Sequence, residues 1–218
     1  MSAIQRFYPL MAVVAIAFSV VAVIAGQLGP DATLDWLNVT ISEYAVADRG
    51  GITEAGMMAL GLGSLALLGA LRSTGAPVRG LPEWLLRIWS GALIVAAIVP
   101  TVPLGLDMTT EAQVHRYVSV AAFVALPAAA ALLASRFAAN RDWKPVARTM
   151  EWLALAGGFG LAAITYVALP GDRVMIGLVE RVLLASEVAV LVVLAAWVVR
   201  LAWAKRVQFL TYHNFLTS

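Results

Sequence analysis

The strongest constraint on this chain is a series of apolar runs, each long enough to cross a membrane as a helix. A helix needs about 20 apolar residues to span roughly 30 Å of hydrocarbon. Lipid offers no hydrogen bonds to a bare backbone, so these runs are predicted to be helical. Six runs have this length, over residues 7–25, 52–71, 84–102, 114–137, 150–169 and 176–203. The sequence therefore predicts an all-α protein, a six-transmembrane-helix bundle in one domain over 1–206, followed by a C-terminal tail over 207–218.

Composition excludes several other classes of protein. Apolar residues make up 61% of the 218 residues and charged residues 13%, against about a half and a quarter in soluble domains. The sequence contains no cysteine, which excludes disulfides and thiolate metal sites. A net charge of +2 is too small to indicate a nucleic-acid partner. Membrane lipids are the expected partners instead.

Basic residues predict the orientation, because Lys and Arg concentrate on the cytoplasmic side of membrane proteins. The predicted helices alternate in direction, which sorts the basic residues into two sets. The larger set is Arg6, Arg72, Arg79, Arg87, Arg136, Arg141, Lys144, Arg148, Arg200, Lys205 and Arg206, and the smaller is Arg49, Arg116, Arg173 and Arg181. We therefore expect a multi-pass protein of the cell inner (plasma) membrane with both termini in the cytoplasm.

The longest polar interruption runs from Asp35 to Glu54, between the first two apolar runs. It is about twenty residues long without a recognisable element, which is more than a simple connector needs. The short loops around Asp107–His115 and Gly171–Arg181 are predicted to emerge at the same, outer side. Acidic residues also gather there, either because outer loops are solvated or because they share a polar pocket. We expect the interruption to form a wall or lid over the adjoining helix ends.

A candidate catalytic group lies in these loops. His115 is predicted about one turn into the fourth long helix, which Thr110 would cap. Ser42 and Asp107 are predicted at the same membrane level, so the three residues suggest a nucleophile, a base and an acid. No nucleophile elbow surrounds Ser42, and a histidine that orders a loop is the alternative. One histidine with carboxylates is a poor zinc site, so neither a metal nor another cofactor is expected.

A candidate ligand site shares this level. Arg181 and Arg116 are predicted to hold an anionic group. Glu187 lies two turns deeper than Glu180, near the middle of the bilayer, where a carboxylate is costly and usually has a function or a partner. It is interpreted as a buried proton site, with a structural hydrogen bond as the alternative. The predicted ligand-binding residues are Glu43, Tyr44, Asp48, Arg116, Glu180, Arg181 and Glu187.

Three segments carry a resemblance to a known family. The sequences ISEY (41–44), HRYVSVAAF (115–123) and IGLVERVLL (176–184) resemble motifs of the DUF998 family of six-span bacterial and archaeal membrane proteins. The resemblance covers roughly residues 7–203. It implies an integral membrane protein without a settled activity, and it points to Ser42, His115, Glu180 and Arg181.

A looser similarity connects the chain to the alkaline ceramidase and progestin-receptor group of membrane hydrolases. That group has seven spans and a zinc site of three histidines with Ser and Asp. This chain lacks the late histidine pair and one span, so the similarity does not carry zinc chemistry over.

Three functions fit the pattern. The first is a binding or transport-type protein, whose outer polar pocket takes a small-molecule or lipid-derived ligand. Against transport, the sequence has no internal repeat. The second is an intramembrane lipid-modifying enzyme of hydrolase type, with His115 as base and Ser42 or a water as nucleophile. The third is an accessory subunit that packs against a larger membrane protein partner.

Overall fold

The computed structural model describes residues 7–28, 35–47, 51–102 and 107–217, and every regular element within these ranges is an α-helix. Six of its helices are long and apolar enough to cross a membrane. The predicted all-α, six-span bundle is therefore confirmed, and the chain is a multi-pass membrane protein. The helices are α1 (Tyr8–Gln27), α2 (Ile41–Ala47), α3 (Ile52–Ser73), α4 (Leu81–Ile98), α5 (Thr110–Ala138), α6 (Lys144–Ala168) and α7 (Ile176–Thr217).

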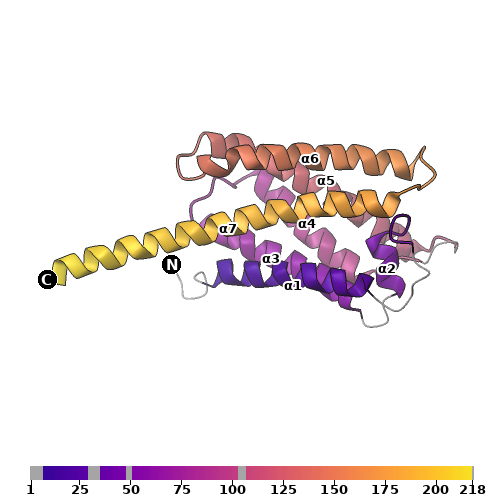
Figure 1. The fold of residues 1–218 in the computed structure, drawn as a ribbon, viewed down its shortest axis with the longest axis horizontal. Coiled ribbons are helices and arrows are strands. Elements are labelled where there is room, and N and C mark those ends of the chain that lie inside the picture. The colour runs from indigo at the N-terminus through magenta and orange to yellow at the C-terminus, as the bar shows by residue number, and fades with distance from the viewer. Residues whose placement is uncertain (1–6, 29–34, 48–50, 103–106, 218) are drawn as a thin grey trace.

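The six long helices lie side by side, and the short helix α2 lies at one end of the bundle (Figure 1). From α3 to α7 each helix packs against the next, while α1 packs on α3, and α7 also contacts α1, α3 and α5. Helix α7 extends beyond the other helices at the end opposite α2 (Figure 1). Its backbone is helical through the predicted boundary at 206/207. Below, "the α2 end" is the end that carries α2, and "the turn end" is the end that carries the α3–α4 turn (74–80).

Small residues set the spacing of the helices. A Cβ added to Gly157 of α6 would lie 2.8 Å from Cγ of Pro127, a residue inside α5. A Cβ on Gly63 of α3 would lie 2.6 Å from Cβ of Ala15 in α1. Such close approaches let helices in lipid gain van der Waals contact where the hydrophobic effect is weak. Large side chains such as Phe159, 76% exposed, face outward and form the surface that meets lipid.

Several helix ends differ from the sequence prediction, by six residues at the start of α6. The run predicted to end at 102 ends at Ile98, because Val99 is already extended before Pro100. Helix α5 is capped by Thr109 rather than Thr110, since the Thr109 side chain accepts from the backbone N–H of Ala112 at 3.2 Å.

The expectation that 35–54 lacks a regular element is wrong, because α2 forms within it. Thr40 and Glu43 make a capping box at its start. The Thr40 hydroxyl oxygen accepts from the Glu43 N–H at 3.2 Å, and Glu43 Oε2 accepts from the Thr40 N–H at 2.8 Å. The spacing Thr-x-x-Glu was readable in the sequence, but a helix of seven residues is too short to show an apolar period.

Candidate functional site

The candidate site is built where α2 and the segment before it rest on the start of α7. Glu180, on the first turns of α7, is 5% exposed, and its Oε2 accepts from the backbone N–H of Ile41 at 2.5 Å. The Leu178 N–H donates to the Leu37 carbonyl at 3.1 Å. A buried carboxylate thus holds the first N–H of α2, and a backbone bond holds the segment that leads into it.

Arg181 is the centre of this arrangement. Its Nε donates to Gln27 Oε1 at 2.6 Å, and its guanidinium lies 5.2 Å from the ring centroid of Tyr44 in α2. Its Nη1 donates to three carbonyl oxygens at 2.9, 2.9 and 2.8 Å, those of Trp36, Val39 and Gly177. Its Nη2 is buried and has no hydrogen-bond partner among the described residues. One arginine therefore joins α1, the segment before α2, and α7, and still keeps one buried nitrogen free.

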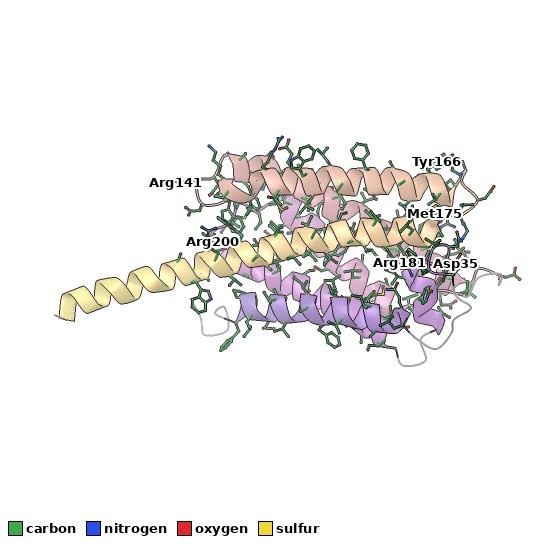
Figure 2. All side chains as sticks on the ribbon, in the orientation of Figure 1. Asp35, Arg141, Tyr166, Met175, Arg181 and Arg200 are labelled. Atoms are coloured by element: carbon green, nitrogen blue, oxygen red, sulfur yellow. The ribbon has the colours of Figure 1, made fainter. Side chains whose placement is uncertain are left out.

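Glycine at 177 permits this close contact. A Cβ on Gly177 would lie 2.7 Å from the Trp36 carbonyl oxygen and 2.8 Å from Arg181 Nη1, and nearer still to the Val39 carbonyl oxygen. Any side chain there would separate the loop from α7. Figure 2 shows Asp35, Met175 and Arg181 together at this end, with Arg141 and Arg200 at the other.

His115 and Ser42 meet beside this cluster. His115 of α5 is 7% exposed, and its Nδ1 lies 2.7 Å from the Val99 carbonyl oxygen. Its Nε2 lies 3.1 Å from the Ser42 hydroxyl oxygen. A carbonyl oxygen only accepts, so Nδ1 carries a hydrogen, and in the neutral ring Nε2 accepts from the Ser42 hydroxyl. The histidine therefore links α2 to α5 and to the end of α4.

Within the described structure, the other predicted catalytic and ligand-binding residues are not hydrogen-bonded to Arg181 or His115. Asp107 is exposed and makes no hydrogen bond to His115 in the described structure, because Nδ1 faces the Val99 carbonyl instead. Arg116 is also exposed. Glu43 Oε1 pairs with Arg173 Nη2 at 2.6 Å. Asp48 lies outside the described residues.

Glu187 is the deepest of the predicted site residues. It is 1% exposed, and both of its carboxylate oxygens lack a hydrogen-bond partner within the described residues. It lies seven residues beyond Glu180 on the same face of α7. Over residues 7–28, 35–47, 51–102 and 107–204, no three His, Asp or Glu side chains gather closely enough to hold a metal ion.

Several residues of the site were missed at the level of sequence. Gln27, Arg173 and Gly177 each hold the α2 segment in place. Gly177 carried a readable signal, since a glycine in the first turn of a long helix indicates a close backbone approach. Gln27 carried none, because its partner Arg181 lies 154 residues away along the chain.

Comparison with known proteins identifies a family but no activity. A family model described as "Protein of unknown function (DUF998)" matches residues 13–197, which is most of the chain. No curated protein matches, and no solved structure matches.

Proposed function

We propose a binding function for this chain, which belongs to the DUF998 family of proteins of unknown function: its α2 end holds the anionic group of a small or lipid-derived ligand. The observation that carries the proposal is Arg181 Nη2, a buried cationic nitrogen without an acceptor among the described residues. From the distribution of Lys and Arg we further propose that this end faces away from the cytoplasm.

The donors of Arg181 argue for an oxygen ligand. Nε and Nη1 are occupied by one amide and three carbonyl oxygens, all of them uncharged acceptors. The two hydrogens on Nη2 remain, and an unmatched buried donor costs about 1–3 kcal/mol, or more where it is charged. A carboxylate or phosphate oxygen at Nη2 would satisfy both the donor and the charge.

Helix α2 is the element that covers this position. Its Tyr44 ring lies against the Arg181 guanidinium. Two side-chain contacts hold the helix in place, Ser42 with His115 and Glu43 with Arg173. A ligand that reaches Nη2 would displace or pass this cover, so we propose α2 as the lid of the site and Glu187 as the buried proton site beneath it.

Arg181→Lys tests the proposal, because lysine keeps the charge but lacks Nη2. The probes are dodecyl phosphate and laurate, which carry net negative charge, with zwitterionic dodecylphosphocholine as the comparison of zero net charge; each is added to protein in a neutral detergent. At 100-fold excess over Kd, a ligand specific for the native state adds about 2.7 kcal/mol of stability. We expect an anionic probe to raise the Tm of the wild-type protein and of Arg116→Lys, but not that of Arg181→Lys.

Two results would contradict the binding proposal. One is an equal rise in Tm for Arg181→Lys and wild type with the anionic probes. The other is an equal effect of dodecylphosphocholine and dodecyl phosphate on wild type. Arg116 is a matched control because it is an exposed arginine at the same end of the bundle.

A second candidate function is favoured by the contact between Ser42 and His115. The Ser42 hydroxyl donates to Nε2 at 3.1 Å, while the Val99 carbonyl holds the hydrogen on Nδ1. This is the relation of nucleophile, base and orienting group in serine hydrolases, with a carbonyl in place of the carboxylate. In an ester hydrolysis, Ser42 Oγ would bond to the acyl carbon as its proton passes to Nε2. His115 would then protonate the departing alcohol, and water would release the acid.

Covalent labelling tests this candidate. A fluorophosphonate probe in membranes should modify Ser42 with release of fluoride, and mass spectrometry of peptides locates the adduct. Labelling should disappear in Ser42→Ala and fall at least tenfold in His115→Asn, which keeps a donor for Val99 but has no base. The exposed Ser135→Ala should label as wild type does. Wild-type protein that stays unlabelled at Ser42 would reject the enzyme.

A further inference from the structure

A cavity at the turn end lies away from the α2 site. Its volume is about 610 Å³, and it opens between the start of α1 and the α3–α4 turn. Its lining includes Tyr8, Gly69, Arg72, Ser73, Gly75 and Arg79. This volume falls in the range of pockets that hold small molecules.

The charge around the cavity is positive. Arg72 Nη1 lies 3.2 Å from Glu83 Oε1, and the same oxygen takes Arg87 Nη2 at 2.6 Å. One carboxylate thus serves two guanidinium groups. The side chain of Arg79 has no hydrogen bond or ion pair among the described residues, and it is exposed on the cavity wall. The wall therefore offers unused cationic donors to an anion.

The turn that carries Arg79 is held firmly from the side of α5. Arg136 Nη1 donates to the carbonyl oxygens of Pro77 and Arg79, at 3.2 and 2.5 Å. Gly75 and Gly80 have φ of 81° and 83°, a conformation that suits glycine, and they bracket the turn. A backbone fixed in this way holds Arg79 at the wall of the cavity that Arg72 also lines.

The carbonyl groups at the end of α3 do not compete for these arginines. The hydroxyl groups of Ser73 and Thr74 both donate to the Ala70 carbonyl, at 2.8 and 3.0 Å. The Thr74 hydroxyl also contacts the Leu71 carbonyl at 3.0 Å. Because the helix end satisfies its own acceptors, the guanidinium of Arg72 remains directed to Glu83 and to the cavity.

Aromatic side chains place the cavity at the depth of lipid headgroups. Trp84, one turn into α4, is 60% exposed and lies 5.1 Å from the Arg87 guanidinium carbon. Trp152 with Arg148 and Trp197 with Arg200 make similar pairs on α6 and α7, at 5.2 and 4.7 Å. Tryptophan gathers at the membrane–water interface, with apolar and polar contacts on its two sides. Tyr8 lies at the start of α1 and forms the apolar wall of the cavity against Gly69.

We propose that this cavity binds a phosphate group, held by Arg72 and Arg79, and that the group belongs to an anionic phospholipid headgroup. Arginine suits phosphate because its planar fork donates two parallel hydrogen bonds to oxyanions. The free donors and the fixed turn favour a phosphate group, and the depth of the cavity favours a headgroup over a ligand from bulk water. The proposal does not depend on the function proposed for the α2 end.

Native mass spectrometry in a neutral detergent tests the site. Delipidated protein is titrated with phosphatidylglycerol, with phosphatidylcholine of the same chains, and with inorganic phosphate. We expect phosphatidylglycerol to bind at least tenfold more tightly than phosphatidylcholine. The double variant Arg72→Gln/Arg79→Gln should lose this preference. The control Arg141→Gln/Arg200→Gln removes the same charge at the same end (Figure 2) and should keep the preference within twofold.

The arms of the experiment separate the alternatives. Inorganic phosphate that competes with phosphatidylglycerol in wild type supports a phosphate site without any variant, so a misfolded variant does not undermine the test. Inorganic phosphate that binds as tightly as the lipid would assign the site to free phosphate and overturn the headgroup. Equal loss of binding in both double variants would show general surface charge and overturn the site itself, as would equal binding of the two lipids.

Discussion

At both ends of the bundle, an arginine of a long helix holds a connecting segment by donating hydrogen bonds to its backbone carbonyls. At the α2 end, Arg181 of α7 donates to three backbone carbonyls and holds the segment before α2. At the turn end, Arg136 of α5 donates to two backbone carbonyls and holds the α3–α4 turn. In both, an arginine from a long helix fastens a connecting segment whose own backbone leaves acceptors open.

The two ends differ in which polar side-chain atoms of the described residues have no hydrogen-bond partner. The buried side-chain atoms without a partner among the described residues are Glu54 Oε2, Arg181 Nη2 and both carboxylate oxygens of Glu187. All belong to residues on the α2 side of the bundle. The turn end keeps its free cationic donors at an exposed wall, where water solvates them at little cost. A buried polar atom without a partner is costly and calls for an explanation, which for Arg181 Nη2 is the ligand proposed above.

Arg181→Ala should give the largest loss of stability of any single change at these ends. It leaves three carbonyls and the Gln27 amide without their donor, and hydrogen bonds to charged groups are worth about 1.5–3 kcal/mol each. Since such losses do not add fully, we expect the free energy of unfolding to fall by about 3–5 kcal/mol. Chemical unfolding in mixed micelles measures it.

Arg116→Ala is the control for that change. Arg116 is exposed, and a surface substitution without buried contacts changes stability by about 0.5 kcal/mol or less. If Arg181→Ala and Arg116→Ala lowered the free energy of unfolding equally, the hydrogen bonds of Arg181 would not stabilise the protein. The proposed difference between the two ends of the bundle would then be wrong.

Gly177→Ala should have the next largest effect. The new Cβ would meet two loop carbonyl oxygens and Arg181 Nη1 at less than 3.0 Å, so the loop or α7 must shift. Overpacking of this kind costs about 1–3 kcal/mol. The matched control is Gly158→Ala, where the new Cβ has no neighbour within 4 Å. That control should stabilise the helix by up to about 1 kcal/mol, because alanine is the better helix former. Thermal unfolding of the two variants should therefore move in opposite directions.

The architecture was predictable because hydrocarbon thickness is a physical length that the sequence must match. Six runs of the required length predicted six spans, and most of their ends fall within a few residues of those observed. Chemistry at the ends was less predictable. Ser42 and His115, 73 residues apart, could be placed at one membrane level from topology alone, and they do meet. The short helix α2, which carries Ser42, was missed, although Thr40 and Glu43 carry its capping signal.

The contacts of Glu180 and Arg181 with the α2 segment could not be predicted, because their partners there are backbone atoms. Glu180 binds an N–H group, and Arg181 binds carbonyls, so no complementary side chain marks either contact in the sequence. The charge of Arg181 suggested an acidic partner or an anionic ligand, and the structure gives it neutral acceptors. Membrane depth alone suggested Asp107 as a neighbour of His115, whereas the Val99 carbonyl oxygen lies at Nδ1 in the structure.

Arg136→Ala tests the turn end, where we expect a smaller loss of stability. Two carbonyls lose their donor, one of them part-buried and one exposed. Water replaces the donor at the exposed group, so we expect a loss of about 1–2 kcal/mol, less than for Arg181→Ala. Hydrogen exchange should report it as faster exchange confined to the α3–α4 turn. A loss as large as that of Arg181→Ala would mean that the two fastenings are equivalent.

Glu187→Leu should give the smallest change, and with the opposite sign. The carboxylate is buried and has no hydrogen-bond partner among the described residues, so replacing it with an apolar side chain of similar volume removes a cost. We expect stability without ligand to rise by about 1 kcal/mol, with Glu187→Gln between leucine and wild type because its amide stays polar. A fall in stability for both variants would mean that Glu187 holds a structural partner in the native bundle. A rise would mean that the Glu187 carboxylate does not stabilise the fold. It would also sharpen the contrast between the ends, because no buried side-chain nitrogen or oxygen at the turn end lacks a partner among the described residues.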